Sequence, residues 1–143
     1  MEYEASRAMP AESRIVFDIA ADVAAMHRWL PEEITVRSIA DDLAEADSRF
    51  YDVREDRDGL MRKAPEQLRL EWGSRGRPDY AGWLQVSDQG AGTSEVVVHL
   101  SFLADQPAAL GSNRARDVTQ RLLQHSLDRL AEEVGRRVTQ PGA

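Results

Sequence analysis

A single histidine, His99, stands in the middle of an apolar run in this 143-residue sequence. A histidine in such a place could act as a general base if its side chain faced a cavity. Its parity along the run groups it with Ser101 and sets it opposite Val98 and Leu100, so we expect it on the outer face of a strand. A catalytic role for His99 is therefore the weaker interpretation.

Acidic and metal-ligating residues give a second set of candidates. The stretch Asp41-Asp42-Leu43-Ala44-Glu45 resembles a motif that holds magnesium and diphosphate, because clustered carboxylates suit hard cations. These acids follow a strand-like run, so we expect a solvated loop there instead. His27 and His125 have no second ligand at metal spacing, and the chain has no cysteine. We predict no metal site and no cofactor.

Large apolar and aromatic residues form the third set, which could line a cavity for a small molecule. Trp72 and Tyr80 lie on either side of a predicted turn and share the apolar parity of their strands, while Arg69 and Glu71 should face solvent. The alternative role of the apolar residues is packing in a core. The predicted cavity lining is Phe17, Trp72, Tyr80, Leu84, Val98, Leu100, Leu123, Leu127 and Leu130.

The strands that would carry these residues follow from β-rich runs, several of which alternate apolar and polar residues. We expect strands at residues 2–9, 34–40, 49–53, 60–63, 67–73, 80–87 and 95–103. Turns with Gly, Pro and Asp separate the last strands, at residues 74–79 and 88–92. Strands joined by turns instead of helices make an antiparallel sheet.

Apolar residues at helical spacing predict helices at both ends of the chain. Two short helices fit between Pro10 and Pro31, with Asp22 as the cap of the second one. A long helix with an apolar stripe is expected from its cap, Asn113, to Val138. The opposite face of this helix should carry ion pairs at a spacing of four residues, namely Asp117–Arg121, Glu132–Arg136 and Glu133–Arg137.

These elements predict an α+β fold in which a curved antiparallel sheet wraps around the long C-terminal helix. A length of 143 residues suits one domain with one core. We expect that domain to cover residues 1–138 and a frayed tail to cover residues 139–143. A strongly curved sheet and one helix often leave a cavity between them, of the kind that small molecules occupy.

The formal net charge of −7 makes nucleic acid an unexpected partner, because phosphate repels a negative chain that does not gather its basic residues on one face. Arginines are instead mixed with acids, as in residues 52–58. No apolar run is long enough to cross a membrane. The first ten residues lack the basic and then apolar pattern of an export signal, so we expect a cytoplasmic protein.

The run SRIVFDIAAD at residues 13–22, followed by Trp29-Leu30-Pro31, resembles the opening of START-like (SRPBCC) proteins. The polyketide cyclase/dehydrase and coenzyme Q-binding branch is the most similar. The resemblance covers nearly the whole chain by element order and implies a helix-grip fold. Members bind lipids, polyketides or other apolar molecules, and some cyclise or hydrate them. The glycine-rich loop of the plant-allergen branch is missing, since Gly73 and Gly76 do not match its pattern.

Three functions follow as alternatives. The first is binding of an apolar small molecule of lipid, polyketide or isoprenoid type in an internal cavity, without a need for catalysis. The second is a polyketide cyclase or dehydratase in which Tyr80 and a trapped water do acid–base work. The third is a protein-interaction module in which Trp83, expected opposite His99, belongs to a homodimer patch on the outer sheet face. We favour the first, because the sequence contains no convincing catalytic pair.

Overall fold

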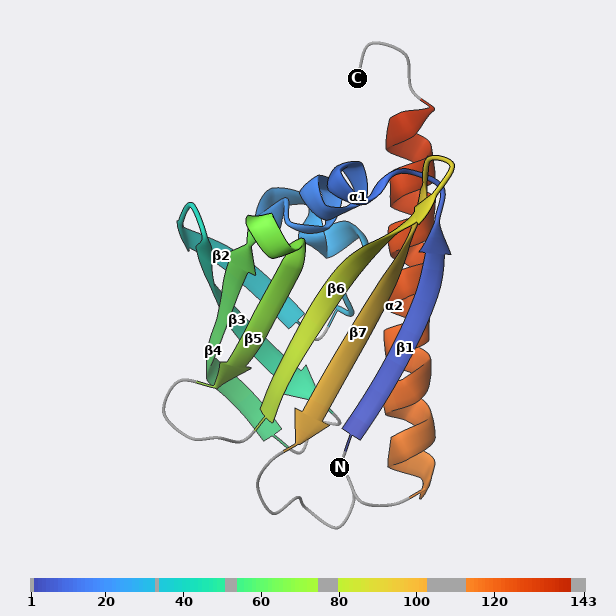
Figure 1. Cartoon of the computed structure of the whole chain (residues 1–143). Helices are drawn as coiled ribbons and strands as arrows, with labels where there is room; N and C mark the ends of the chain where they lie inside the picture. The colour runs from blue at the N-terminus through green and yellow to red at the C-terminus, as the bar shows by residue number, and fades with distance from the viewer. Residues whose placement is uncertain (1, 33, 51–53, 75–79, 103–112, 140–143) are drawn as a thin grey trace.

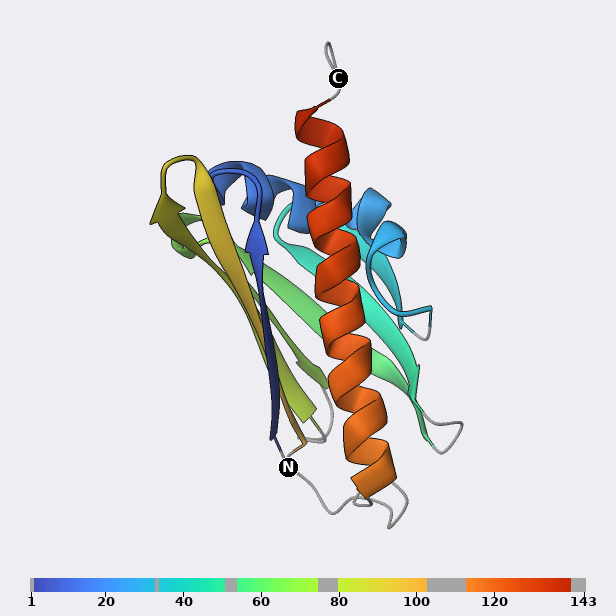
Figure 2. The same ribbon diagram turned by 90° about the vertical axis from the view of Figure 1, so that its right-hand side faces the viewer.

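The computed structural model of the chain describes residues 2–32, 34–50, 54–74, 80–102 and 113–139. Side chains of residues 48–50, 54–58, 74, 80, 102 and 113–116 fall outside this description. A seven-stranded antiparallel sheet in the order β1-β7-β6-β5-β4-β3-β2 curls around one side of a long helix (Figures 1 and 2). The predicted α+β fold class is confirmed.

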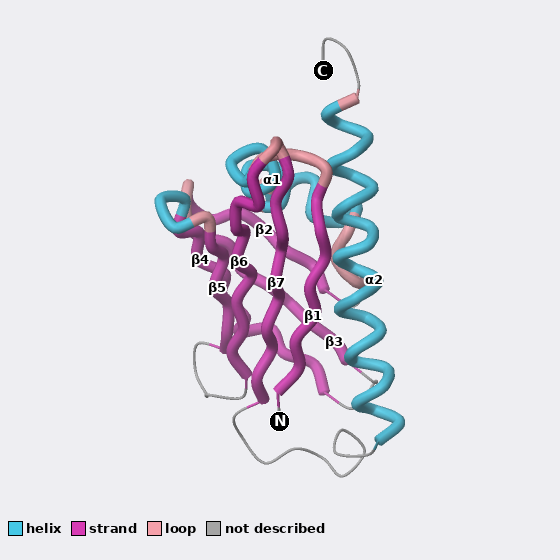
Figure 3. Tube along the Cα trace, turned by 45° about the vertical axis from the view of Figure 1, so that its right-hand side comes forward, coloured by secondary structure: helices cyan, strands magenta, loops and turns pink. Residues whose placement is uncertain are grey.

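The elements follow one another in the predicted order. The strands are β1 (Glu2–Met9), β2 (Ile34–Ala40), β3 (Leu43–Phe50), β4 (Arg54–Ala64), β5 (Arg69–Ser74), β6 (Tyr80–Gly90) and β7 (Thr93–Phe102). The α-helices are α1 (Ser13–Ala20) and α2 (Asn113–Val138), and the short 3-10 helices are η1 (Val23–Arg28) and η2 (Pro65–Gln67). In Figure 3 the sheet begins with β1 beside α2 and curves away from this helix through β7, β6 and β5, and β3 and β2 then form its far side.

The acidic stretch at residues 41–45 differs from its prediction as a solvated loop. Only its first two residues form the turn, and β3 begins at Leu43. Ala44 is completely buried, and Glu45 forms an ion pair with Arg37 across the β2–β3 hairpin. The stretch looks like a loop in the sequence because two of its acids form the turn and the third, Glu45, alternates on the strand with the small residues Ala44 and Ala46.

Residues 49–50 and 60–63 of the predicted strands belong to one longer hairpin made by β3 and β4. β4 is 11 residues long, so the prediction misses its first half. That half, residues 54–58, consists only of charged residues, which carry no apolar alternation. Residues 51–53, between the two strands, lie outside the described part of the chain.

The predicted helix caps are only partly correct. Asp22 precedes η1 but makes no capping hydrogen bond with its side chain. Its carboxylate lies 3.4 Å from Nη2 of Arg137 on α2 instead. Asn113 is the first residue of α2, and its side chain is outside the described residues.

Glutamine side chains of α2 cover the free edge of β1. Gln120 Nε2 donates a hydrogen bond of 2.6 Å to the backbone oxygen of Glu4, and Gln124 Nε2 donates one of 3.3 Å to that of Ser6. No neighbouring strand reaches this edge in the sheet order, so the glutamines supply partners to carbonyl groups that would otherwise need water. The long helix is thereby fixed to one border of the sheet.

The cross-strand register arranges the concave face in rows of side chains. One row crosses the seven strands from β2 to β1 and contains Ser38, Ala44, Met61, Trp72, Gly82, Leu100 and Tyr3. The next row toward α1 contains Lys63, Leu70, Leu84, Val98 and Ala5. Six of these side chains belong to one buried apolar cluster with residues of α1 and α2, and Trp72 packs against it. The core therefore lies between the concave face and the helices.

Candidate functional site

Trp72 lies on the concave face, directly opposite Gly82 on the neighbouring strand. A Cβ atom added to Gly82 would stand 2.6 Å from Cε2 of Trp72 and 2.8 Å from the backbone oxygen of His99. The indole therefore lies against the backbone at Gly82, an approach that only glycine permits. Trp72 is only partly buried, so it keeps accessible surface beside the core.

In its row on the concave face, Trp72 stands between Met61 and Gly82. Ala44 lies beyond Met61 in the same row, and the adjacent row contains Ala46 of β3 opposite both Gly59 of β4 and Val36 of β2. Small residues leave more space beneath a covering helix than Leu or Phe would. Ala46 and Val36 are only partly buried.

On the helix side, the apolar stripe of α2 faces this surface, and its Leu123 is also only partly buried. We define Val36, Ala46, Trp72 and Leu123 as the concave-face site. Val36, Trp72 and Leu123 each pack against the buried core cluster, and Ala46 is the cross-strand neighbour of Val36. An arrangement of this kind can hold an apolar group by burial alone.

The structure divides the predicted cavity residues into a packed group and an accessible group. The packed group, buried in the core, is Phe17, Leu84, Val98, Leu100, Leu127 and Leu130. Trp72 and Leu123 keep accessible surface. Tyr80 is the first residue of β6, and its side chain lies outside the described residues. Ligand contact by these residues stays a prediction, and Trp72 and Leu123 are the members best placed for it.

A separate depression of about 460 Å³ lies on the outward side of α2. Among described residues its lining is Val118, Arg121, Leu122, Gln124, His125 and Asp128. On a helix with 3.6 residues per turn, Arg121 and His125 point away from the buried Leu127 and Leu130. This depression is therefore distinct from the concave-face site, and its described lining includes none of the predicted cavity residues.

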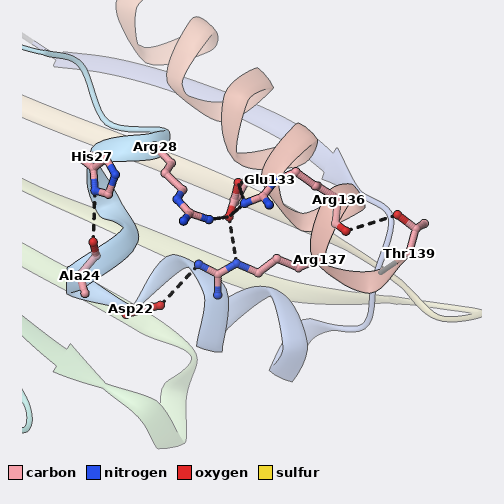
Figure 4. A network of polar contacts seen from close by, with 8 residues as sticks. All are labelled: Asp22, Ala24, His27, Arg28, Glu133, Arg136, Arg137 and Thr139. Carbon is pink, nitrogen blue, oxygen red and sulfur yellow. Dashed lines mark hydrogen bonds and ion pairs between the residues drawn. The ribbon is translucent and has the colours of Figure 1, made fainter. Parts of the chain in front are cut away.

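Glu133 of α2 is only 7% exposed and sits in a group of arginines (Figure 4). Its carboxylate accepts hydrogen bonds from Arg28 of η1 at 3.0 Å, Arg136 at 2.6 Å and Arg137 at 2.9 Å. Burial by itself raises the pKa of Glu133, but the hydrogen bonds from these arginines outweigh burial and lower the pKa from 4.5 to about 2. We call Glu133, Arg28, Arg136, Arg137 and Asp22 the Glu133 clasp.

The clasp corrects the predicted charged face of α2. The predicted Glu133–Arg137 pair is present, but Arg136 binds Glu133 and not Glu132. The expected exposure of Glu133 is wrong because η1 packs against this side of the helix and brings Arg28 to the carboxylate. The clasp thus joins η1 to the last turns of α2.

The outer sheet face carries the predicted cross-strand pair of Trp83 and His99. Their rings stack with centroids 5.2 Å apart and planes 11° apart. Arg69, from the strand on the other side of Trp83, places its Cζ 4.7 Å from the centre of the indole ring. Nδ1 of His99 lies 3.1 Å from Oε2 of Glu4. Since neighbours cover Trp83 from both adjacent strands, it offers limited apolar surface, and the homodimer patch stays a prediction.

Few buried polar side chains in the described part of the chain could act on a ligand. Ser94 donates a hydrogen bond of 2.9 Å to the backbone oxygen of Ala11, and Glu133 is held by its arginines. Trp29 is buried, and its Nε1 has no hydrogen-bond partner. Sequence reasoning includes Trp29 in the apolar helical pattern before Pro31 and in the opening motif, but its unpaired donor becomes visible only in the folded chain.

The described residues contain no group of three or more His, Asp or Glu side chains that could hold a metal ion. Among the helices of these same residues, none is long and apolar enough to cross a membrane.

Residues 1–135 match the family model described as polyketide cyclase/dehydrase and lipid transport. The chain belongs to this family. The match extends from β1 into the last turns of α2, so it includes the concave-face site and Glu133. No curated protein sequence matches this family member significantly.

Solved structures share the fold of this polyketide cyclase/dehydrase family member. A protein from Thermus thermophilus has a TM-score of 0.75 at 20% identity, over 98% of this chain and 100% of its own. The Zhui aromatase/cyclase from Streptomyces sp. R1128 has a TM-score of 0.71 at 13% identity, over 100% and 98%. A START superfamily protein from Mycobacterium smegmatis has a TM-score of 0.65 at 11% identity, over 94% of this chain and 97% of its own. These similarities establish the START-like helix-grip fold.

Proposed function

We propose that this protein binds an apolar small molecule of lipid, polyketide or isoprenoid type at the concave-face site, in the cytoplasm, and that binding needs no catalysis. The observation that carries the proposal is the partly accessible Trp72, which lies against Gly82 and packs on the apolar core cluster. Covering apolar surface yields about 25 cal/mol per Å², so an accessible indole beside the core favours an apolar ligand. Membership of a family named for polyketides and lipid transport supports this.

The kinds of polar side chains buried in the interior favour binding over catalysis. The buried polar side chains among described residues are Ser94, Thr119, Ser126 and Glu133, and no histidine stands among them. Glu133 is already neutralised by arginines, so it is a poor general base. Among these four side chains no pair is suited to acid–base catalysis.

A polyketide cyclase or dehydratase is the second candidate, because the family model and the Zhui aromatase/cyclase both point to that chemistry. Tyr80 would be its acid–base residue. It lies two residues before Gly82 on β6, next to the row that contains Trp72. If the protein is an enzyme, Tyr80→Phe should abolish turnover and keep ligand affinity. A variant that keeps both turnover and affinity would show that Tyr80 has no part in the mechanism.

The binding proposal is tested by filling the concave-face site from β3. Ala46→Leu adds bulk on the inner side of the strand, and Asp47→Leu adds bulk on its exposed outer side as the matched control. Affinity for the neutral fluorescent probe N-phenyl-1-naphthylamine should fall about tenfold or more in Ala46→Leu, because overpacking costs about 1–3 kcal/mol. Asp47→Leu should bind like the wild type. Equal affinity in both variants would contradict the placement of the site.

A further inference from the structure

Trp29 carries a hydrogen-bond donor that no group in the described part of the protein uses. The residue is 5% exposed, and its Nε1 is buried without a partner. Buried polar groups in native proteins are almost always paired, and a buried tryptophan usually finds an acceptor for its N–H. The indole N–H is therefore open to an acceptor that the described residues do not supply.

Trp29 is part of the buried core against which the concave-face site packs. It belongs to one apolar cluster with Leu84 of the sheet and Leu127 of α2. Trp72 and Leu123 of the concave-face site pack against this same cluster. They are only partly buried, so they can shift to admit a ligand more easily than the fully packed core can.

The residue before Trp29 fixes its position. Arg28 donates a hydrogen bond of 3.0 Å to Glu133, and Glu133 also accepts one of 2.9 Å from Arg137 (Figure 4). η1 additionally packs on β2 and α2. The clasp therefore holds the indole donor in place before any ligand arrives, which lowers the entropic cost of recognising a single polar atom.

We propose that Trp29 is the polar recognition residue of the ligand site, and that its indole N–H donates a hydrogen bond to a carbonyl, ether or hydroxyl oxygen of the bound molecule. This inference rests on the proposed function. It narrows the ligand from apolar molecules in general to apolar molecules that carry an oxygen acceptor. A pure hydrocarbon of the same shape leaves the N–H of Trp29 unpaired and gains less on binding.

Two compounds of the same shape test the inference with the full chain. 9-Fluorenone carries a carbonyl group, and fluorene has a methylene in its place. Equilibrium dialysis should show that the wild type binds 9-fluorenone about tenfold more tightly than fluorene, which corresponds to about 1.4 kcal/mol. Trp29→Phe should remove this preference. Trp83→Phe, on the outer sheet face, should keep it.

NMR of the wild type provides a readout that does not depend on the variants. The chain has three tryptophans, so the indole N–H signal of Trp29 can be resolved and assigned. It should shift downfield with 9-fluorenone and not with fluorene. Equal affinity for both compounds with no such shift overturns the role of Trp29 and leaves the proposed function standing. If neither compound binds, the proposed function fails, and the role of Trp29 fails with it.

Discussion

Replacing Glu133 by Gln tests whether the clasp holds η1 against α2. Glutamine keeps the size of the side chain and removes the charge that the arginines neutralise. The lowered pKa, from 4.5 to about 2, sets an upper bound of roughly 3 kcal/mol on the stabilisation, at 1.36 kcal/mol per unit. Because the arginines are partly exposed and screened by water, we expect a loss of about 1–2 kcal/mol in the free energy of unfolding at pH 7.

The pH dependence of this loss gives a sharper test. Since the pKa of Glu133 is lower in the folded protein than in the unfolded chain, its contribution is complete above pH 4.5 and disappears as the pH falls toward 2. The difference between wild type and Glu133→Gln should therefore be largest at pH 7 and shrink strongly by about pH 2.5. Urea unfolding followed by tryptophan fluorescence measures it at both values.

The exposed neighbour Glu132 provides the matched control. Glu132→Gln removes the same charge one residue earlier, outside the clasp, and should change the free energy of unfolding by less than about 0.5 kcal/mol at either pH. Equal stability of wild type and Glu133→Gln at pH 7 would refute the reasoning. A difference that persists unchanged at low pH would refute its electrostatic origin.

Further predictions concern glycines and the sheet edge. Gly82→Ala should lower the free energy of unfolding in urea by about 1–3 kcal/mol, since the added methyl group collides with Trp72. A Cβ atom at Gly135 on α2 would have its nearest neighbour 3.9 Å away, so Gly135→Ala should instead raise the free energy of unfolding by up to about 1 kcal/mol. A change of the same sign in both variants would contradict this contrast. Replacing Gln120 and Gln124 together by Ala should lower the free energy of unfolding by about 1 kcal/mol and promote association in analytical ultracentrifugation, whereas sedimentation equal to that of the wild type would contradict their protective role.

Much of the fold could be predicted because its outer elements carry clear periodic patterns. β1, β2 and α2 have the predicted bounds, and β7 differs by one or two residues. The hairpin of β3 and β4 could not be predicted in full, because its charged and small residues give no apolar signal. The buried partners of that hairpin, such as Ala44, become visible only once neighbouring strands are in register.

The candidate site was harder to predict than the fold. Parity could place Trp72 on the apolar face, but the approach of its indole to Gly82 depends on the register between β5 and β6. The burial of Glu133 depends on Arg28, which lies 105 positions away in the sequence. The unpaired N–H of Trp29 likewise depends on the whole core. Spacing along one element contains none of this information.

The central claim is that this family member holds an apolar small molecule between its sheet and α2. Native mass spectrometry of freshly purified protein, compared with the denatured chain, tests this most directly. We predict a noncovalent added mass that disappears on denaturation and is reduced in Ala46→Leu but not in Asp47→Leu. A bare chain that also shows no saturable binding of N-phenyl-1-naphthylamine would contradict the claim.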